Sequence, residues 1–341
     1  MVNRTNGAGP RTVWREGVAL AAPRAPRSGR RGEPRTCNPL LLEERGKQQI
    51  ARATLEESLG NWQETAFSLS HGARSFLEVA EFHEQLFREL RQRGAEPEAL
   101  EDQRKIAIKY YQRSADVRRE AITAFERIGY MREIARDYAF LGKTLFVLGV
   151  LDRNVPTLRE AVETRSRALD LFNSMGITDL ASAELVYLAE THREIGRFEE
   201  DPRLKLEAYL QARGLAERAL AQLPSEERPR QRCFLLEVSA KVAFLRDDPE
   251  EAAQIRDGGL SLAEEVGKLD LAGPAAHCLF VAAKLQRFIA KKSGRRADLE
   301  EALKLTERAH RAFLEMGQQK PILNLAAHIL ELKQLLEQTN G

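Results

Sequence analysis

The chain has 341 residues, with 53 Lys and Arg against 51 Asp and Glu, and it is 43% hydrophobic and 30% charged. No stretch approaches the roughly 18–20 apolar residues of a membrane-spanning helix, so we expect no membrane span. Aromatic residues make up only 6% of the chain, and segments rich in Val, Ile or Thr are few, which argues against a β-sandwich or β-barrel.

The first 36 residues differ from the rest in composition. They contain eight Arg and only two acidic residues, a net charge of +6, which leaves −4 for the remainder of the chain. Four prolines and five glycines accompany this charge, and such a segment buries too little apolar surface to offset the entropy of ordering. The apolar stretch Val18–Ala22 is too short for a secretory signal. We therefore predict a disordered tail over residues 1–40 and a folded region over 41–338.

The cysteines indicate a reducing compartment. Cys37, Cys233 and Cys278 stand far apart and include no Cys-x-x-Cys pair. An odd, sparse set of this kind argues against a disulfide framework, and it favours a cytoplasmic location.

From about residue 40 onward the apolar residues follow helical spacing. Taken in chain order, the predicted helix ends are apolar segments that close on a glycine, namely Ala124–Gly129, Leu171–Gly176, Leu262–Gly267 and Phe313–Gly317. Glycine is favoured there because the residue that ends a helix often takes a positive φ. The predicted helix starts are the segments Leu158–Ala161, Lys205–Ala208, Pro249–Ala252 and Leu299–Ala302, whose alanines are separated by 47, 44 and 50 residues.

Small residues in the middle of predicted helices indicate close packing. Gly142, Ala189 and Ala240 each lie within an apolar helical stripe. Glycine in a helix costs about 1 kcal/mol of helix propensity, so the approach of a neighbouring helix is the expected reason for Gly142. The apolar segment Ile322–Leu336 is predicted as a terminal helix that packs on the last pair.

These segments resemble a tetratricopeptide repeat (TPR) array. The segment Ala168–Gly176 is similar to the end of helix B in the longer-repeat subtype found in kinesin light chains and in sensor arms of signal-transduction ATPases, and Gly60–Thr65 resembles an ordinary TPR turn. The resemblance covers about residues 45–338. It implies an all-α, right-handed superhelical solenoid of about five to six antiparallel helix pairs with a concave binding groove.

The sequence departs from the family pattern in four places. Residues 150–156 and 197–202 suggest linkers longer than the family's turns. The repeats near 230–260 and 275–317 are irregular, which leaves their register open.

The resemblance also implies a binding face, because outward residues of each helix A line the TPR groove. Transferred by register, the expected partner-binding residues are Arg136, Lys143, Phe146, Glu190, Arg193, Lys241, Phe244, Lys284 and Arg287. Their charges are mixed, so they do not form the all-basic clamp that holds a carboxylate terminus. A solvated surface would account equally well for any one of them.

Motifs for catalysis and metal binding are incomplete. Gly142-Lys143-Thr144 resembles the end of a phosphate-binding loop, but Asp137 stands where the loop needs its first glycine. The six histidines form no metal-ligand spacing and no Gly-x-Ser-x-Gly elbow occurs, so we expect no enzyme activity, metal or cofactor. The basic cluster Lys291–Arg296 is interpreted as a solvated turn, and we do not expect nucleic-acid binding.

The sequence thus favours a non-catalytic interaction scaffold that binds a peptide or protein segment. The alternative is a ligand- or peptide-sensing regulatory arm of a signalling system, since such arms share the repeat subtype. The sequence leaves open the identity of the partner and the oligomeric state.

Overall fold

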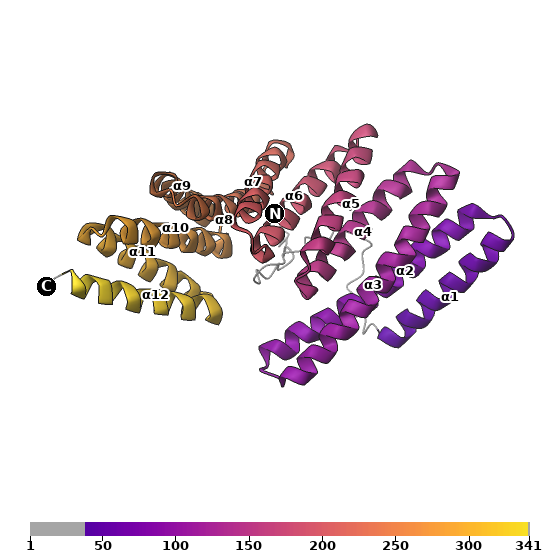
Figure 1. Ribbon diagram of the computed structural model, residues 1–341, viewed down its shortest axis with the longest axis horizontal. Coiled ribbons are helices and arrows are strands. Elements are labelled where there is room, and N and C mark those ends of the chain that lie inside the picture. Colours follow the sequence, from indigo (N-terminus) through magenta and orange to yellow (C-terminus); the bar gives the residue numbers. More distant parts are fainter. Residues whose placement is uncertain (1–37, 340–341) are drawn as a thin grey trace, which may run out of the picture. The chain divides into compact units, whose positions relative to one another are not determined.

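The computed structural model describes residues 38–339, and within them every regular element is an α-helix (Figure 1). The helices are α1 (Pro39–Ser58), α2 (Trp62–Gln92), α3 (Pro97–Ile128), α4 (Met131–Asp152), α5 (Val155–Ser174), α6 (Thr178–Phe198), α7 (Pro202–Gln222), α8 (Arg228–Arg246), α9 (Pro249–Lys268), α10 (Ala272–Ser293), α11 (Arg296–Glu315) and α12 (Gln319–Gln338). The predicted disordered tail lies outside the described residues, except that its last residues, Pro39 and Leu40, already belong to α1.

Each helix packs on the one that follows it along the chain. Because the turns between them are short, consecutive helices run antiparallel, and one amphipathic helix buries its apolar stripe only against its neighbours. The predicted all-α solenoid of antiparallel helix pairs is confirmed, with twelve helices in the described residues.

From α4 onward the array has a regular period of 47 residues. Helices α5, α7, α9 and α11 begin at Val155, Pro202, Pro249 and Arg296, each 47 residues after the last. Helices α4 and α6 start 47 residues apart, as do α10 and α12. The register that the sequence left open between 230 and 317 is therefore the same as in the preceding repeats.

Local side-chain chemistry sets where these helices begin. The side chain of Asn154 accepts a hydrogen bond from the backbone N–H of Thr157 at 3.0 Å, and Asp201 and Asp248 cap α7 and α9 from the equivalent position. A capping oxygen of this kind satisfies an N–H group that has no partner within the helix. The linkers predicted to be long are short, because α4 extends to Asp152 and only Arg153 and Asn154 separate it from α5.

Three of the four predicted glycine ends are confirmed. Gly129, Gly176 and Gly317 have φ values of 71°, 70° and 66°, and each lies just after a helix. Gly267 was predicted to do the same, but it lies inside α9, and Asp270 takes the positive φ of 54° instead.

A small residue brings neighbouring helices close together, as predicted. A Cβ added to Gly142 in α4 would lie 2.5 Å from Cγ of Arg165 in α5. The equivalent position in α6, Ala189, is fully buried. Glycine in the middle of α4 lowers the helix propensity, but it leaves the space that this close packing requires.

A buried ion pair recurs at the same position of two successive repeats. Arg118 in α3 bonds to Asp137 in α4 (Nη1 to Oδ1, 2.5 Å), and Arg165 in α5 bonds to Glu184 in α6 (Nη1 to Oε2, 2.9 Å). Both members of the second pair lie 47 residues after their counterparts, and all four side chains are at most 6% exposed. Each pair ties an odd-numbered helix to the even-numbered helix that follows it.

Candidate partner-binding face

One charged side chain occupies the same repeat position on each even-numbered helix from α4 to α12. These residues are Lys143, Glu190, Glu237, Lys284 and Glu331, each 47 residues after the last. We call the side that they mark the even-helix row.

Ion pairs and one contact between a histidine and a carboxylate join neighbouring helices along this row. Lys143 Nζ in α4 lies 2.6 Å from Glu81 Oε1 in α2. Between α6 and α8, Arg193 Nη1 lies 3.8 Å from Glu237 Oε2, and between α8 and α10, His277 Nε2 lies 3.4 Å from the same oxygen. These contacts show that the even-numbered helices they join lie side by side.

The far end of the row is joined in the same way. Glu331 in α12 receives Arg287 of α10 (Nη1 to Oε2, 3.4 Å) and also Lys291, one helical turn further along. These bonds lower the pKa of Glu331, the hydrogen bond from Lys291 having the largest effect.

The centre of the row is a polar cluster formed by Arg193, Glu194, Glu237 and His277. Arg193 Nη2 donates to Glu194 Oε1 at 2.8 Å, and its guanidinium lies 5.3 Å from the ring centre of Phe234. Burial alone would raise the pKa of Glu237, but the hydrogen bond from His277 and the charge of Arg193 lower it to about 2. The cluster thus holds an ionised carboxylate beside the guanidinium of Arg193.

Glu190, one turn from this cluster, is in a different state. It is half-buried, and burial raises its pKa to about 7, against the opposing charges of Arg193 and Arg165. Its carboxyl group therefore gains or loses a proton near neutral pH, where a cationic group brought by a partner would favour the ionised form.

The predicted residues of α8 and α10 divide into surface and packed positions. Lys241 is exposed, and Lys284 Nζ lies 4.0 Å from the ring centre of Phe280. Phe244 is half-buried and packs edge-on against Phe288, with ring centres 5.2 Å apart, so it supports the core.

Two predicted residues of α4 lie differently from the rest of the row. Phe146 is only 2% exposed and belongs to the core, so its predicted role in binding is wrong. Phe146 occupies the same repeat position as Arg193. At this position α4 buries an aromatic ring, whereas α6 carries a charged side chain, so the register taken from the TPR family does not predict exposure here. Arg136 is exposed, bonds to Glu133 of its own helix at 3.1 Å, and lies one helical turn from the ring of Phe140.

Four residues of the row were missed from the sequence: Glu81, Glu237, His277 and Glu331. The 47-residue period was the available signal, because Glu237 and Glu331 lie at multiples of 47 from the predicted Lys143. His277 has no such signal, because the six histidines show no metal-ligand spacing in the sequence.

The charged groups of the row are spread along the even-numbered helices. Among residues 38–339, no group of three or more His, Cys, Asp and Glu side chains could hold a metal ion. The charged groups pair with one another along the row instead of converging on one point, an arrangement suited to contacts with an extended partner.

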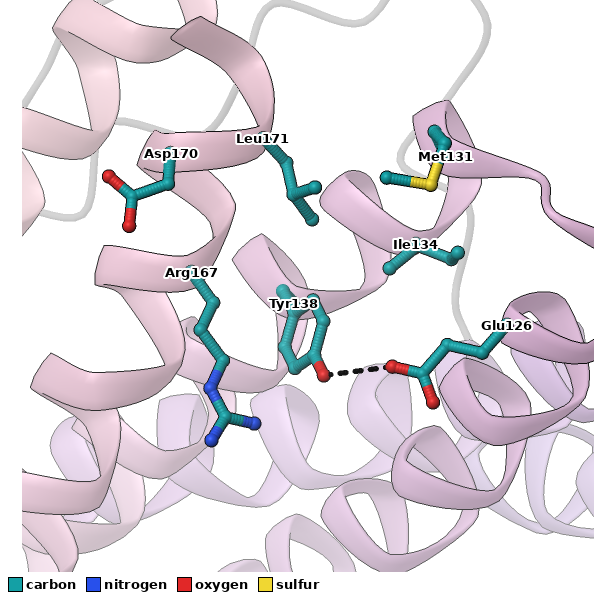
Figure 2. A pocket seen from close by; sticks show the side chains of 7 residues that line it. All are labelled: Glu126, Met131, Ile134, Tyr138, Arg167, Asp170 and Leu171. Carbon is teal, nitrogen blue, oxygen red and sulfur yellow. Dashed lines mark hydrogen bonds between the residues drawn. The ribbon is translucent and has the colours of Figure 1, made fainter. Parts of the chain in front are cut away.

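A separate hollow of about 370 Å³ lies between α3, α4 and α5 (Figure 2). In Figure 2 the hydroxyl of Tyr138 donates to Glu126 Oε1 at 3.2 Å, with Arg167 beside the ring. Its rim residues Glu126 and Met131 are exposed, and none of the predicted binding residues lines it. The hollow is open to solvent, and its lining combines four polar residues (Glu126, Tyr138, Arg167 and Asp170) with three apolar ones (Met131, Ile134 and Leu171).

No family model matches the chain. No curated protein matches its sequence. Similar solved structures include a circular tandem repeat protein with a novel repeat topology (18% identity, TM-score 0.36, covering 88% of this chain and 75% of that one). Another is a tetratricopeptide repeat protein from Parabacteroides merdae ATCC 43184 (13% identity, TM-score 0.31, covering 87% of this chain and 100% of that one).

The assignment of the fold rests on the helices themselves and on their 47-residue period. The chain is an all-α helical repeat protein. Among the described residues, no helix is both long enough and apolar enough to cross a membrane.

Proposed function

We propose that this helical repeat protein is a non-catalytic interaction scaffold of the TPR type that binds a peptide or protein segment along the even-helix row. The observation that carries the proposal is the charged position repeated on five successive even-numbered helices, at 143, 190, 237, 284 and 331. A solenoid presents such positions at regular spacing, and an extended partner meets them one after another.

The charges along the row suggest what the partner carries. Lysines stand at 143 and 284, acids at 190 and 237, and the exposed Lys241 lies beside Glu237. A segment with an acidic group opposite Lys143, basic groups opposite Glu190 and Glu237, and an acidic group opposite Lys284 complements this order. The sparse cysteines support a cytoplasmic location for the scaffold.

Two triple variants with the same change in charge test the proposal. In the row variant, Lys143, Lys241 and Lys284 become Gln. Arg193 is left intact because it holds Glu194 and Glu237 in place. In the control variant, three exposed cationic residues of odd-numbered helices become Gln, namely Arg218, Lys268 and Lys304. Surface changes of this kind alter stability by no more than about 0.5 kcal/mol each, so both variants should fold.

Immobilised wild type, row variant and control variant are each exposed to lysate of the source cell, and captured proteins are quantified by mass spectrometry. A true partner is captured by the wild type and by the control variant but not by the row variant. Titration calorimetry with the purified partner should then show binding to the row variant at least tenfold weaker than to the wild type. Equal capture by all three proteins, or equal affinity of both variants for a purified partner, would refute a role for the row.

A further inference from the structure

Two cysteines that lie far apart in the sequence meet in the core. Cys233 in α8 and Cys278 in α10 are both fully buried free thiols, and their Sγ atoms lie 3.0 Å apart. A disulfide has an S–S length of about 2.05 Å, so a movement of about 1 Å brings the two sulfur atoms to bonding distance.

The repeat explains why they meet. The two positions are 45 residues apart, two fewer than the period, so they fall on successive even-numbered helices. Helix α8 contacts α10 about as extensively as it contacts α9. Both thiols belong to one apolar cluster, together with Leu236 and Leu279.

We propose that Cys233 and Cys278 are a modification site: they form a reversible disulfide that ties α8 to α10 across α9. The oxidant is a small-molecule disulfide such as oxidised glutathione. One cysteine thiolate attacks it, forms a mixed disulfide and releases one glutathione thiolate. The second cysteine thiolate then attacks the protein sulfur of the mixed disulfide and releases the other glutathione. Overall, two cysteine thiols are oxidised, one glutathione disulfide is reduced, and the two protons pass to the two glutathione thiols.

The surroundings of the pair determine how fast this exchange runs. The hydrogen bond with Cys233 and burial both raise the pKa of the Cys278 thiol, which disfavours the attacking thiolate in the closed fold. Exchange therefore proceeds when α8 and α10 separate locally, and closure of the fold then brings the sulfur atoms together. Cytosolic disulfides are commonly of this transient kind.

The cross-link would act directly beneath the even-helix row. Cys233 precedes Phe234, on which Arg193 lies, and Cys278 follows His277, which bonds to Glu237. Oxidation would thus hold α8 and α10 at the spacing that the polar cluster requires.

The test uses the full chain in glutathione buffers of increasing oxidised fraction, with urea added below the unfolding midpoint to speed opening. After acid quenching, free thiols are alkylated and the protein is digested with trypsin. We expect the fragments 233–241 and 269–284 to appear joined, and dithiothreitol to separate them. The remaining thiol, Cys37, serves as an internal control and should be joined to neither fragment.

Variants and stability complete the test. Cys233→Ala and Cys278→Ala should each abolish the joined fragment, and two variants are made in case one fails to fold. Oxidation of the wild type should raise the urea midpoint, because a cross-link that fits the native geometry restricts mainly the unfolded chain. Complete alkylation of both thiols in every buffer, joining of Cys37 to either fragment, or a lower urea midpoint after oxidation would overturn the proposal.

Discussion

Replacing Glu184 by leucine leaves the guanidinium of Arg165 buried without its ionic partner. The side chains of Arg165 and Glu184 are only 2% and 6% exposed, and their bond is 2.9 Å long. Burial raises the pKa of Glu184, and the charge of Arg165 opposes this effect, so the ion pair forms against a cost of desolvation. Removing one member of such a pair costs about 3–5 kcal/mol, since the other charge stays buried and uncompensated.

Replacing both members gives a different result. In the double variant Arg165→Met with Glu184→Leu no charge remains, and apolar side chains of similar volume fill the space. Exchanges of this kind are often neutral or stabilising, and we expect stability within about 1 kcal/mol of the wild type. The ring of Tyr187, which lies 4.7 Å from the guanidinium, would then pack on the methionine.

Urea unfolding followed by circular dichroism measures these differences. Glu163→Leu, a change at an exposed position of α5, is the control and should shift stability by no more than about 0.5 kcal/mol. An unchanged midpoint for Glu184→Leu would refute the reasoning, and so would a double variant as unstable as the single one.

Two further predictions concern packing and pH. Gly142→Ala should destabilise the fold by about 1–3 kcal/mol in the same urea assay, because the new methyl group meets Arg165. The control Gly258→Ala has open space around it and should stabilise the fold by up to about 1 kcal/mol. Equal changes in stability for the two variants would contradict the contact between α4 and α5 at Gly142. The pKa of Glu190 is about 7 in the fold against 4.5 ordinarily, so wild-type stability should fall relative to Glu190→Gln as the pH rises from 4.5 to 7, by at most about 3 kcal/mol, and stay level above 7. Parallel stability curves for these two proteins would show that Glu190 titrates normally in the fold.

The sequence predicted the helices well because their signals are local. Apolar spacing, a capping side chain and a closing glycine act within one or two turns, as at Asn154 and Gly176. Gly267 failed because a glycine is also tolerated inside a helix, and the residue that took the positive φ was Asp270.

The period was harder to read from one sequence. Ala252 was aligned with Ala208, although the residue 47 positions after Ala208 is Ile255. The two candidates lie about one helical turn apart and thus share a face, so helical periodicity alone could not separate them. With Ala252 aligned in this way the period does not appear constant, and the equivalence of Glu237 and Glu331 to Lys143 is not apparent.

The contacts between distant segments could not be predicted at all. Arg165 and Glu184 look like ordinary surface charges in a helical pattern, yet both are buried. The separation of Cys233 from Cys278 argued against pairing, but the repeat brings them together. In each case the decisive fact is a tertiary distance between helices.

The most direct measurement of the central claim is amide hydrogen exchange of the protein alone and in complex with the partner found by the capture experiment. The account predicts that protection on binding follows the even-numbered helices, above all around Glu190, Glu237 and Lys284, while the outer faces of α5, α7, α9 and α11 exchange as before. Protection confined to the odd-numbered helices, or to the first 37 residues, would contradict it.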